Sequence, residues 1–91
     1  MKNVVLNCEK LIHKEEAHSY LACMLDFPDY YGKNLDALFD CLTELGECTI
    51  VLEGENLLHQ TDSYGIKVMK VLEEAAEVNP NLKLKMQEAE I

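Results

Sequence analysis

The sequence predicts an α/β fold in which a three-stranded parallel sheet is flanked by about four helices, within a single domain covering residues 1–91. Three apolar segments have the character of strands. The stretches between them are long enough to hold crossover helices, which favours parallel connections. A chain of 91 residues accommodates one hydrophobic core, and its 48% hydrophobic content without low-complexity runs predicts a folded globule.

The opening residues predict a strand and then a helix. Residues 4–6 (VVL) are apolar without alternation, which predicts a strand buried on both faces. Over residues 14–25 apolar side chains recur at helical spacing, with His18 and two glutamates on the polar side, as in an amphipathic helix. Pro28 excludes the preceding residue from the α region and so ends this helix.

The middle of the chain predicts a second helix and a central strand. Asn34 suits an N-cap, because its side-chain oxygen can accept a free amide of the first turn, and residues 35–42 follow as helix with Gly46 at the exit. Residues 49–52 (TIVL) are apolar and largely β-branched, which predicts a strand covered on both faces. Gly54 breaks that strand.

The last third predicts two helices and an edge strand. A short helix is expected over residues 55–60, and a longer one follows, capped by Asp62 or Ser63. The residues Asn79-Pro80-Asn81 end the longer helix. Beyond them apolar and polar residues alternate over residues 82–87, which predicts a half-buried strand at the edge of the sheet.

The charge distribution argues against a nucleic-acid binder and favours a basic partner. The chain carries 17 acidic residues against 8 lysines and no arginine, giving a net charge of −9. Between Lys33 and Lys67 there are seven acidic residues and no basic one. Such a surface attracts cationic partners, although the same excess is also found on solvated faces that serve only solubility.

Cysteine usage and the absence of targeting signals predict a cytoplasmic protein. The first residues lack the pattern of a secretory signal, and no apolar run approaches the ~20 residues of a membrane span. The spacing of the cysteines and the three histidines matches no metal site, so reduced and mostly buried thiols are expected at Cys8, Cys23, Cys41 and Cys48. We expect no cofactor, no metal, no catalytic residue, and a monomer when the chain is free.

The predicted second helix is poorly suited to stability alone. Between residues 35 and 45 the apolar side chains cover an arc of about 200° around the helix axis, about twice the width of the apolar stripe that a core-facing helix needs. Leu35 and Phe39, which extend this arc, are therefore candidates for partial exposure. Asp36, Asp40 and Glu44 follow one another at four-residue spacing without a lysine to relieve them. This arrangement indicates either an interface or an ordinary solvated face with Phe39 buried.

The loop before this helix carries two tyrosines and a glycine. Tyr30 and Tyr31 combine a large contact area with a hydroxyl group, which suits an interface, although paired loop tyrosines also pack over a core edge. Gly32 is expected to supply a backbone geometry that a side chain would forbid.

The segment PDYYGKNLDALFDCLT at residues 28–43, followed by TIVLE at residues 49–53, resembles the barstar family, the intracellular inhibitors of barnase-type ribonucleases. The similarity extends to the opening strand, the long final helix and the total length. It implies a three-stranded parallel sheet flanked by helices. It also implies that the second helix and its preceding loop plug a basic ribonuclease's active site, with carboxylates in the places of substrate phosphates.

The resemblance implies a role for individual positions. Asp40 corresponds to the central carboxylate, set against the arginines and histidine of the nuclease, and Asp36 to its neighbour one turn earlier. Tyr30 corresponds to the tyrosine that packs on the catalytic histidine, and Glu74 to a peripheral acid of the last helix. The other residues expected at the binding surface are Tyr31, Gly32, Asn34, Leu35, Phe39, Thr43 and Glu44.

Two departures from the family pattern keep a second hypothesis open. Phe39 stands where the family commonly has tryptophan, and Glu44-Leu45 where it has glycine and an aromatic residue. The alternative is an acidic interaction or antitoxin module of the same fold, directed at another basic protein. An enzyme using Asp36 and Asp40 as an acid–base pair or as Mg²⁺ ligands is weakly supported, because no cleft signature or further ligand set accompanies them.

Overall fold

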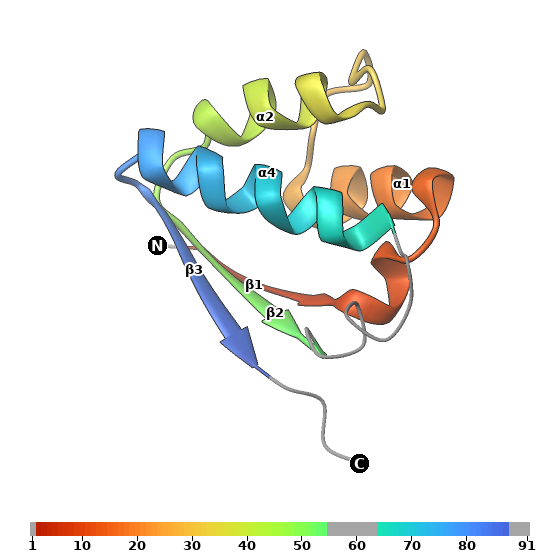
Figure 1. Ribbon diagram of the computed structural model, residues 1–91. Coiled ribbons are helices and arrows are strands. Elements are labelled where there is room, and N and C mark those ends of the chain that lie inside the picture. The colour runs from red at the N-terminus through yellow and green to blue at the C-terminus, as the bar shows by residue number, and fades with distance from the viewer. Residues whose placement is uncertain (1, 55–63, 88–91) are drawn as a thin grey trace.

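The computed structural model describes residues 2–54 and 64–87, which form a parallel sheet with helices packed on it (Figure 1). The described elements are, in chain order, β1 Lys2–Asn7, the 3-10 helix η1 Cys8–Leu11, α1 Lys14–Leu25, α2 Leu35–Thr43, β2 Cys48–Glu53, α4 Tyr64–Val78 and β3 Leu82–Gln87. The predicted α/β class is confirmed. The helix expected at residues 55–60, and the helix cap expected at residue 62 or 63, lie outside the described residues.

The sheet has the order β1-β2-β3, and both pairings are parallel. Val4 pairs with Ile50, which pairs in turn with Leu84, so the strands are in register along their whole length. β2 is the central strand, and β3 lies at an edge, as the alternation of its residues predicted. Gly54 follows β2 with a φ of 84°, a conformation that suits glycine and agrees with its expected role as a strand breaker.

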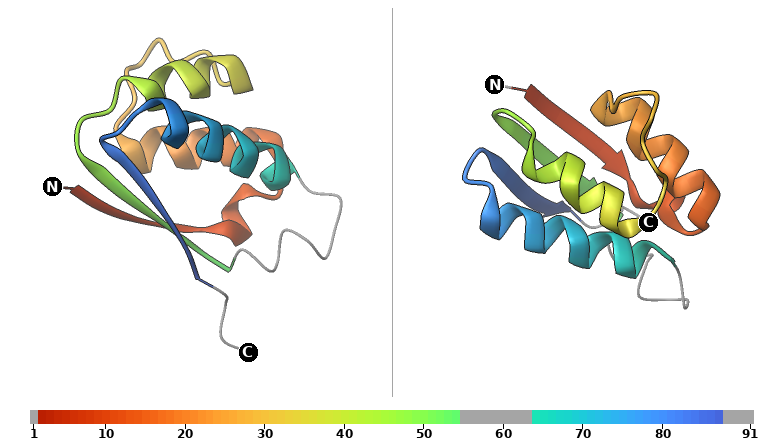
Figure 2. Two further views of the ribbon diagram at one scale, coloured as in Figure 1. Left: turned by 60° about the vertical axis from the view of Figure 1, so that its left-hand side comes forward. Right: turned by 90° about the horizontal axis from the view of Figure 1, so that it is seen from above.

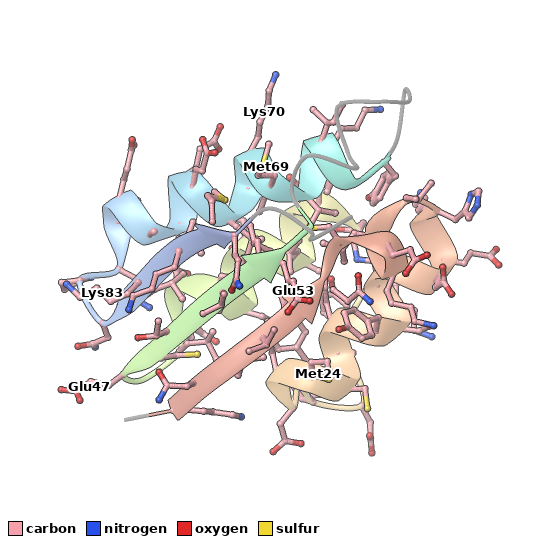
Figure 3. The ribbon with its side chains drawn as sticks, turned by 90° about the horizontal axis from the view of Figure 1, so that it is seen from below. Met24, Glu47, Glu53, Met69, Lys70 and Lys83 are labelled. Carbon is pink, nitrogen blue, oxygen red and sulfur yellow. The ribbon has the colours of Figure 1, made fainter. Side chains whose placement is uncertain are left out.

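All the described helices lie on one face of the sheet, and no described element covers the other face, here called the open face (Figure 2). Leu6 and Ile50 are fully buried beneath the helices, whereas Val5 is 50% exposed on the open face. Figure 3 views that face, where Glu53 and Lys83 project from β2 and β3. The prediction that residues 4–6 are buried on both faces is therefore wrong, whereas in β2 Thr49, Ile50 and Leu52 are buried and Val51 is half-buried. The strands follow one another in the order β1-β2-β3, and both crossover connections have the same handedness. Both connections, with their helices, therefore lie on the same face of the sheet.

The two helices nearest the functional region begin as predicted. α1 spans the predicted residues, and Asp26 closes it in the left-handed region with a φ of 57°. Asn34 caps α2 by accepting a hydrogen bond from the Ala37 amide at 2.8 Å. α2 ends at Thr43, with Glu44 as its C-cap, so Gly46 lies beyond the helix and does not form its exit.

α2 is the helix farthest from the sheet. It packs on α4, with its outer side toward solvent (Figure 1, Figure 2). Leu38 and Leu42 form its buried side. None of the described helices has the length and apolar content of a membrane span.

The one-sided core predicts opposite outcomes for two neighbouring residues of β1. Leu6→Ala removes a side chain with no exposed surface and should lower the free energy of unfolding by about 2–5 kcal/mol. Val5→Ala, on the open face, should change it by less than about 1 kcal/mol. Urea unfolding followed by circular dichroism measures both, and similar losses for the two variants would contradict the one-sided sheet.

Candidate functional site

The outer side of α2 presents the predicted acidic row. Asp36, Asp40 and Glu44 are exposed, and Leu35 and Phe39 are half-buried beside them. Partial exposure of Leu35 and Phe39 agrees with the wide apolar arc of this helix. The surface of α2 therefore combines accessible hydrophobic area with charges that have no partner on the helix itself.

A hollow between α2 and α4 brings a distant acid to this row. It has a volume of about 360 Å³, and its lining residues are Leu35, Asp36, Phe39, Asp40, Val71 and Glu74. Glu74 comes from α4, and three carboxylates therefore surround a floor of apolar side chains. The structure thus brings Glu74 together with four predicted site residues of α2.

A larger hollow, of about 640 Å³, lies on the other side of α2, against the loop that follows α1. Tyr30, Tyr31 and Gly32 line it from the loop, and Asp40 and Glu44 line it from the helix. Tyr30 is 88% exposed. Asp40 lines both hollows and therefore lies between them.

Tyr31 differs from Tyr30, because it is buried and holds the loop in place. Its hydroxyl lies 2.7 Å from Nδ1 of His18, and Nε2 of His18 lies 2.8 Å from the hydroxyl of Tyr64. The ring of Tyr31 also packs on Phe27 at a centroid distance of 4.8 Å. The Tyr31–His18–Tyr64 chain thus ties the loop to α1 and α4.

His18 was expected on the polar side of α1, and this was wrong. Its side chain is 1% exposed, because the loop and the start of α4 close over it and occupy both ring nitrogens. Burial lowers the pKa of His18, and the nearby charges of Lys14 and Lys33 lower it further. The imidazole is therefore neutral, with one nitrogen donating and the other accepting.

A side chain at Gly32 would be crowded by its neighbours, and the backbone angle of this residue is not an unusual one. A Cβ atom there would lie 3.3 Å from the Ala37 Cβ and 3.3 Å from Nδ2 of Asn34, closer than most real contacts. The left-handed residue of this loop is Lys33, with a φ of 52°. The expectation that Gly32 supplies a forbidden backbone geometry is corrected accordingly.

Asn79 holds the other end of α2, a role that was not predicted, because the residue was interpreted only as part of a helix stop. Its side chain is 4% exposed, and its Nδ2 donates to the carbonyls of Leu42 and Leu45 at 3.0 Å each. Its Oδ1 accepts from the Asn81 amide at 3.0 Å. Asn79 thereby ties the end of α2 to the residue that follows α4, adding a donor to the Leu42 carbonyl, which also accepts from the Leu45 amide at 3.3 Å.

The remaining predicted site residues serve the helix itself. Asn34 uses both side-chain atoms for capping, and the Thr43 hydroxyl donates to the Asp40 carbonyl at 2.9 Å. Burial raises the pKa of Cys41, and Glu44 and Asp40 raise it further, so this thiol stays protonated. Cys48 is buried like Cys8, whereas Cys23 is exposed. Within residues 2–54 and 64–87, no three potential metal ligands cluster.

Comparison with known proteins assigns the chain to a family. Residues 1–87 match the family model described as Barstar (barnase inhibitor). The chain belongs to the barstar family. A relative from Bacillus subtilis (strain 168), named "Putative ribonuclease inhibitor YrdF", is 38% identical over 80 residues, which cover 85% of this chain and 88% of that protein. Barstar-family proteins are inhibitors and not enzymes, which confirms the expectation of no enzymatic activity.

The hydrogen bonds from the Asn79 side chain to the end of α2 predict that Asn79→Ala destabilises the fold more than Asn81→Ala does. Asn79→Ala removes the side-chain donor to the Leu45 carbonyl and one of the donors to the Leu42 carbonyl, which also accepts from the Leu45 amide, and should lower the free energy of unfolding by about 1–3 kcal/mol. Asn81→Ala is the matched control, because only the Asn81 backbone takes part and its side chain is exposed. Equal unfolding midpoints for the two variants in urea would show that Asn79 does not hold α2.

The buried His18 predicts a pH dependence of stability. Its pKa in the folded chain is below the ordinary value of 6.5, so the unfolded chain binds more protons between the two values. The free energy of unfolding should therefore fall as the pH is lowered below about 6.5. His18→Gln should lack this component, whereas His13→Gln, which changes an exposed histidine, should retain it. Identical pH profiles for wild type and His18→Gln would contradict this account.

Proposed function

We propose that this chain blocks the active site of a basic, barnase-type ribonuclease with α2 and the loop before it. The observation that supports this most directly is the position of Asp40 between two hollows, one of which it shares with Asp36 and Glu74. A ribonuclease cleft must attract the phosphates of its substrate, so it is cationic. Carboxylates grouped on a convex helix can occupy such a cleft without undergoing any reaction.

Long-range attraction would raise the rate of association. The chain has a net charge of −9, and an acidic surface facing a cationic cleft speeds encounter, most strongly at low ionic strength. Once the surfaces meet, Asp36 and Asp40 would lose their water and pair with basic side chains. Pairs of that kind slow dissociation, because breaking them leaves buried charges without partners.

Rigidity of the acidic surface would reduce the entropy lost on binding. Asn34 caps the first turn of α2, and Asn79 holds its last turn. The loop is fixed through Tyr31 and His18. Side chains presented on a fixed scaffold keep their geometry when the partner docks, so little conformational entropy opposes association.

Tyr30 would add the apolar part of the contact. Its ring is 88% exposed, although the neighbouring Tyr31 is buried, so the loop holds one aromatic ring out toward solvent. An exposed tyrosine at the edge of a charged hollow has the properties of an interface anchor, because it offers a large contact area and a hydroxyl group. In the proposed complex this ring packs against a side chain of the nuclease cleft.

Truncation of Asp40 tests this function. Asp40→Ala should weaken inhibition of a barnase-type ribonuclease by about 2–5 kcal/mol, or roughly 30-fold to several thousand-fold, a range for which barnase–barstar is itself a reference case. Glu53→Ala is the control, because Glu53 is an exposed acid on the open face of the sheet. Inhibition of RNA hydrolysis, measured at low salt against inhibitor concentration, gives both values.

Two results would contradict the proposal. Full nuclease activity in the presence of micromolar wild-type protein would exclude inhibition of that nuclease. Equal inhibition by wild type and Asp40→Ala would exclude α2 as the blocking element. Retention of a basic protein without nuclease activity would instead support the alternative of an acidic module directed at another partner.

A further inference from the structure

Three lysines lie at the N-terminal ends of three different helices. Lys14 is the first residue of α1, Lys33 directly precedes the N-cap of α2, and Lys67 lies in the first turn of α4. The three helices run in the same direction, so these ends meet on one side of the molecule, at the right of Figure 1. We refer to Lys14, Lys33 and Lys67 as the lysine cluster.

Two adjoining hollows hold the lysine cluster together. One, of about 430 Å³, is lined by Lys14, Asn34, Leu35, Asp36, Tyr64 and Lys67. The other, of about 270 Å³, is lined by Lys14, Glu15, His18, Ser19 and Lys33. Lys14 lines both hollows and therefore stands between the other two lysines. All three side chains are exposed.

The positions of these lysines are unfavourable for the free protein. The N-terminal end of a helix carries partial positive charge, and three such ends meet here, so each of these cations is repelled, an effect that Glu15, Glu16 and Asp36 in the first turns of α1 and α2 offset in part. In the part of the chain that the structure describes, none of the three ammonium groups makes an ion pair. The backbone of Lys33 also lies in the left-handed region, which costs glycine or asparagine less energy than lysine. Local conflicts of this kind are retained mainly where function requires them.

The lysine cluster borders the acidic surface directly. Leu35 and Asp36 line the hollow shared with Lys14 and Lys67, and they also line the hollow shared with Asp40 and Glu74. The sign of the surface charge therefore changes at the first turn of α2. A nuclease that docks on α2 must also cover this positive end.

We propose that the lysine cluster is a second part of the partner-binding surface, which recognises carboxylates beside the cationic cleft of the ribonuclease. This inference rests on the proposed function and specifies the partner further. A nuclease with basic residues at that place would be repelled, whereas one with acidic residues would be attracted. The negative charge on α2 and the positive charge of the lysine cluster together fix the orientation of the bound nuclease. They also distinguish between nucleases that share a cationic cleft but differ in the charge beside it.

A pair of double variants with the same net charge tests this inference. The first is Lys33→Glu with Lys67→Glu, and the control is Lys83→Glu with Lys85→Glu, which changes exposed lysines of β3. Both variants make the chain more acidic by the same amount, so general attraction to a basic partner rises equally in both. Only a partner with carboxylates at the cluster will bind the first variant more weakly.

The partner for this measurement is the ribonuclease that the immobilised wild-type chain retains from the culture medium of the source organism. The cluster variant should bind it at least 10-fold more weakly than wild type, and the control as tightly or more tightly. Treatment of the wild-type complex with a water-soluble carbodiimide should join Lys14, Lys33 or Lys67 to nuclease carboxylates, as mapped by mass spectrometry. Circular dichroism confirms that both variants fold.

The outcomes separate this inference from the proposed function. Equal or tighter binding of the cluster variant, with no cross-link from the three lysines, overturns the inference. If Asp40→Ala loses inhibition in the same experiment, the proposed function stands without it. If no ribonuclease is retained, the proposed function fails and the inference fails with it.

Discussion

The properties of the candidate site depend on holding α2 as a rigid helix while its acidic side chains repel one another. Asp36, Asp40 and Glu44 follow at four-residue spacing, and each such pair costs an isolated helix about 0.2–0.5 kcal/mol. The structure opposes this repulsion at both ends of α2, through the Asn34 cap and the two hydrogen bonds from Asn79. The buried Leu38 and Leu42 fix the helix between these points.

Local sequence patterns predicted the helices and strands well. They did not predict contacts between residues that are far apart in the chain. The Asn34 cap and the bounds of α1 follow from neighbouring residues, and the structure agrees with both. Whether the sheet is covered on one face or two depends on the handedness of two crossovers, which the apolar run around Val5 does not encode. His18 and Asn79 were missed for the same reason, because their partners lie 13 to 46 residues away.

For the candidate site, the periodicity of α2 predicted exposed acids edged by Leu35 and Phe39, and the structure agrees. Glu74 was placed beside them only through the resemblance to barstar, since no local pattern links α4 to α2. Tyr30 is exposed and Tyr31 is buried, because the Tyr31 hydroxyl bonds to His18. His18 lies outside the segment of residues 28–43 that resembles barstar, so that segment did not predict the difference. The lysine cluster could likewise not be predicted from the sequence, because its members come from three different helices whose N-terminal ends meet only in the fold.

The central claim is that the acidic face of α2 and a ribonuclease substrate occupy the same site. Competition with a nucleotide that inhibits the ribonuclease competitively tests this most directly. Calorimetric titration of the ribonuclease with this chain should show an affinity that falls in proportion to nucleotide concentration, and no ternary complex should form. An unchanged affinity at saturating nucleotide would show that the chain binds elsewhere and would contradict the account.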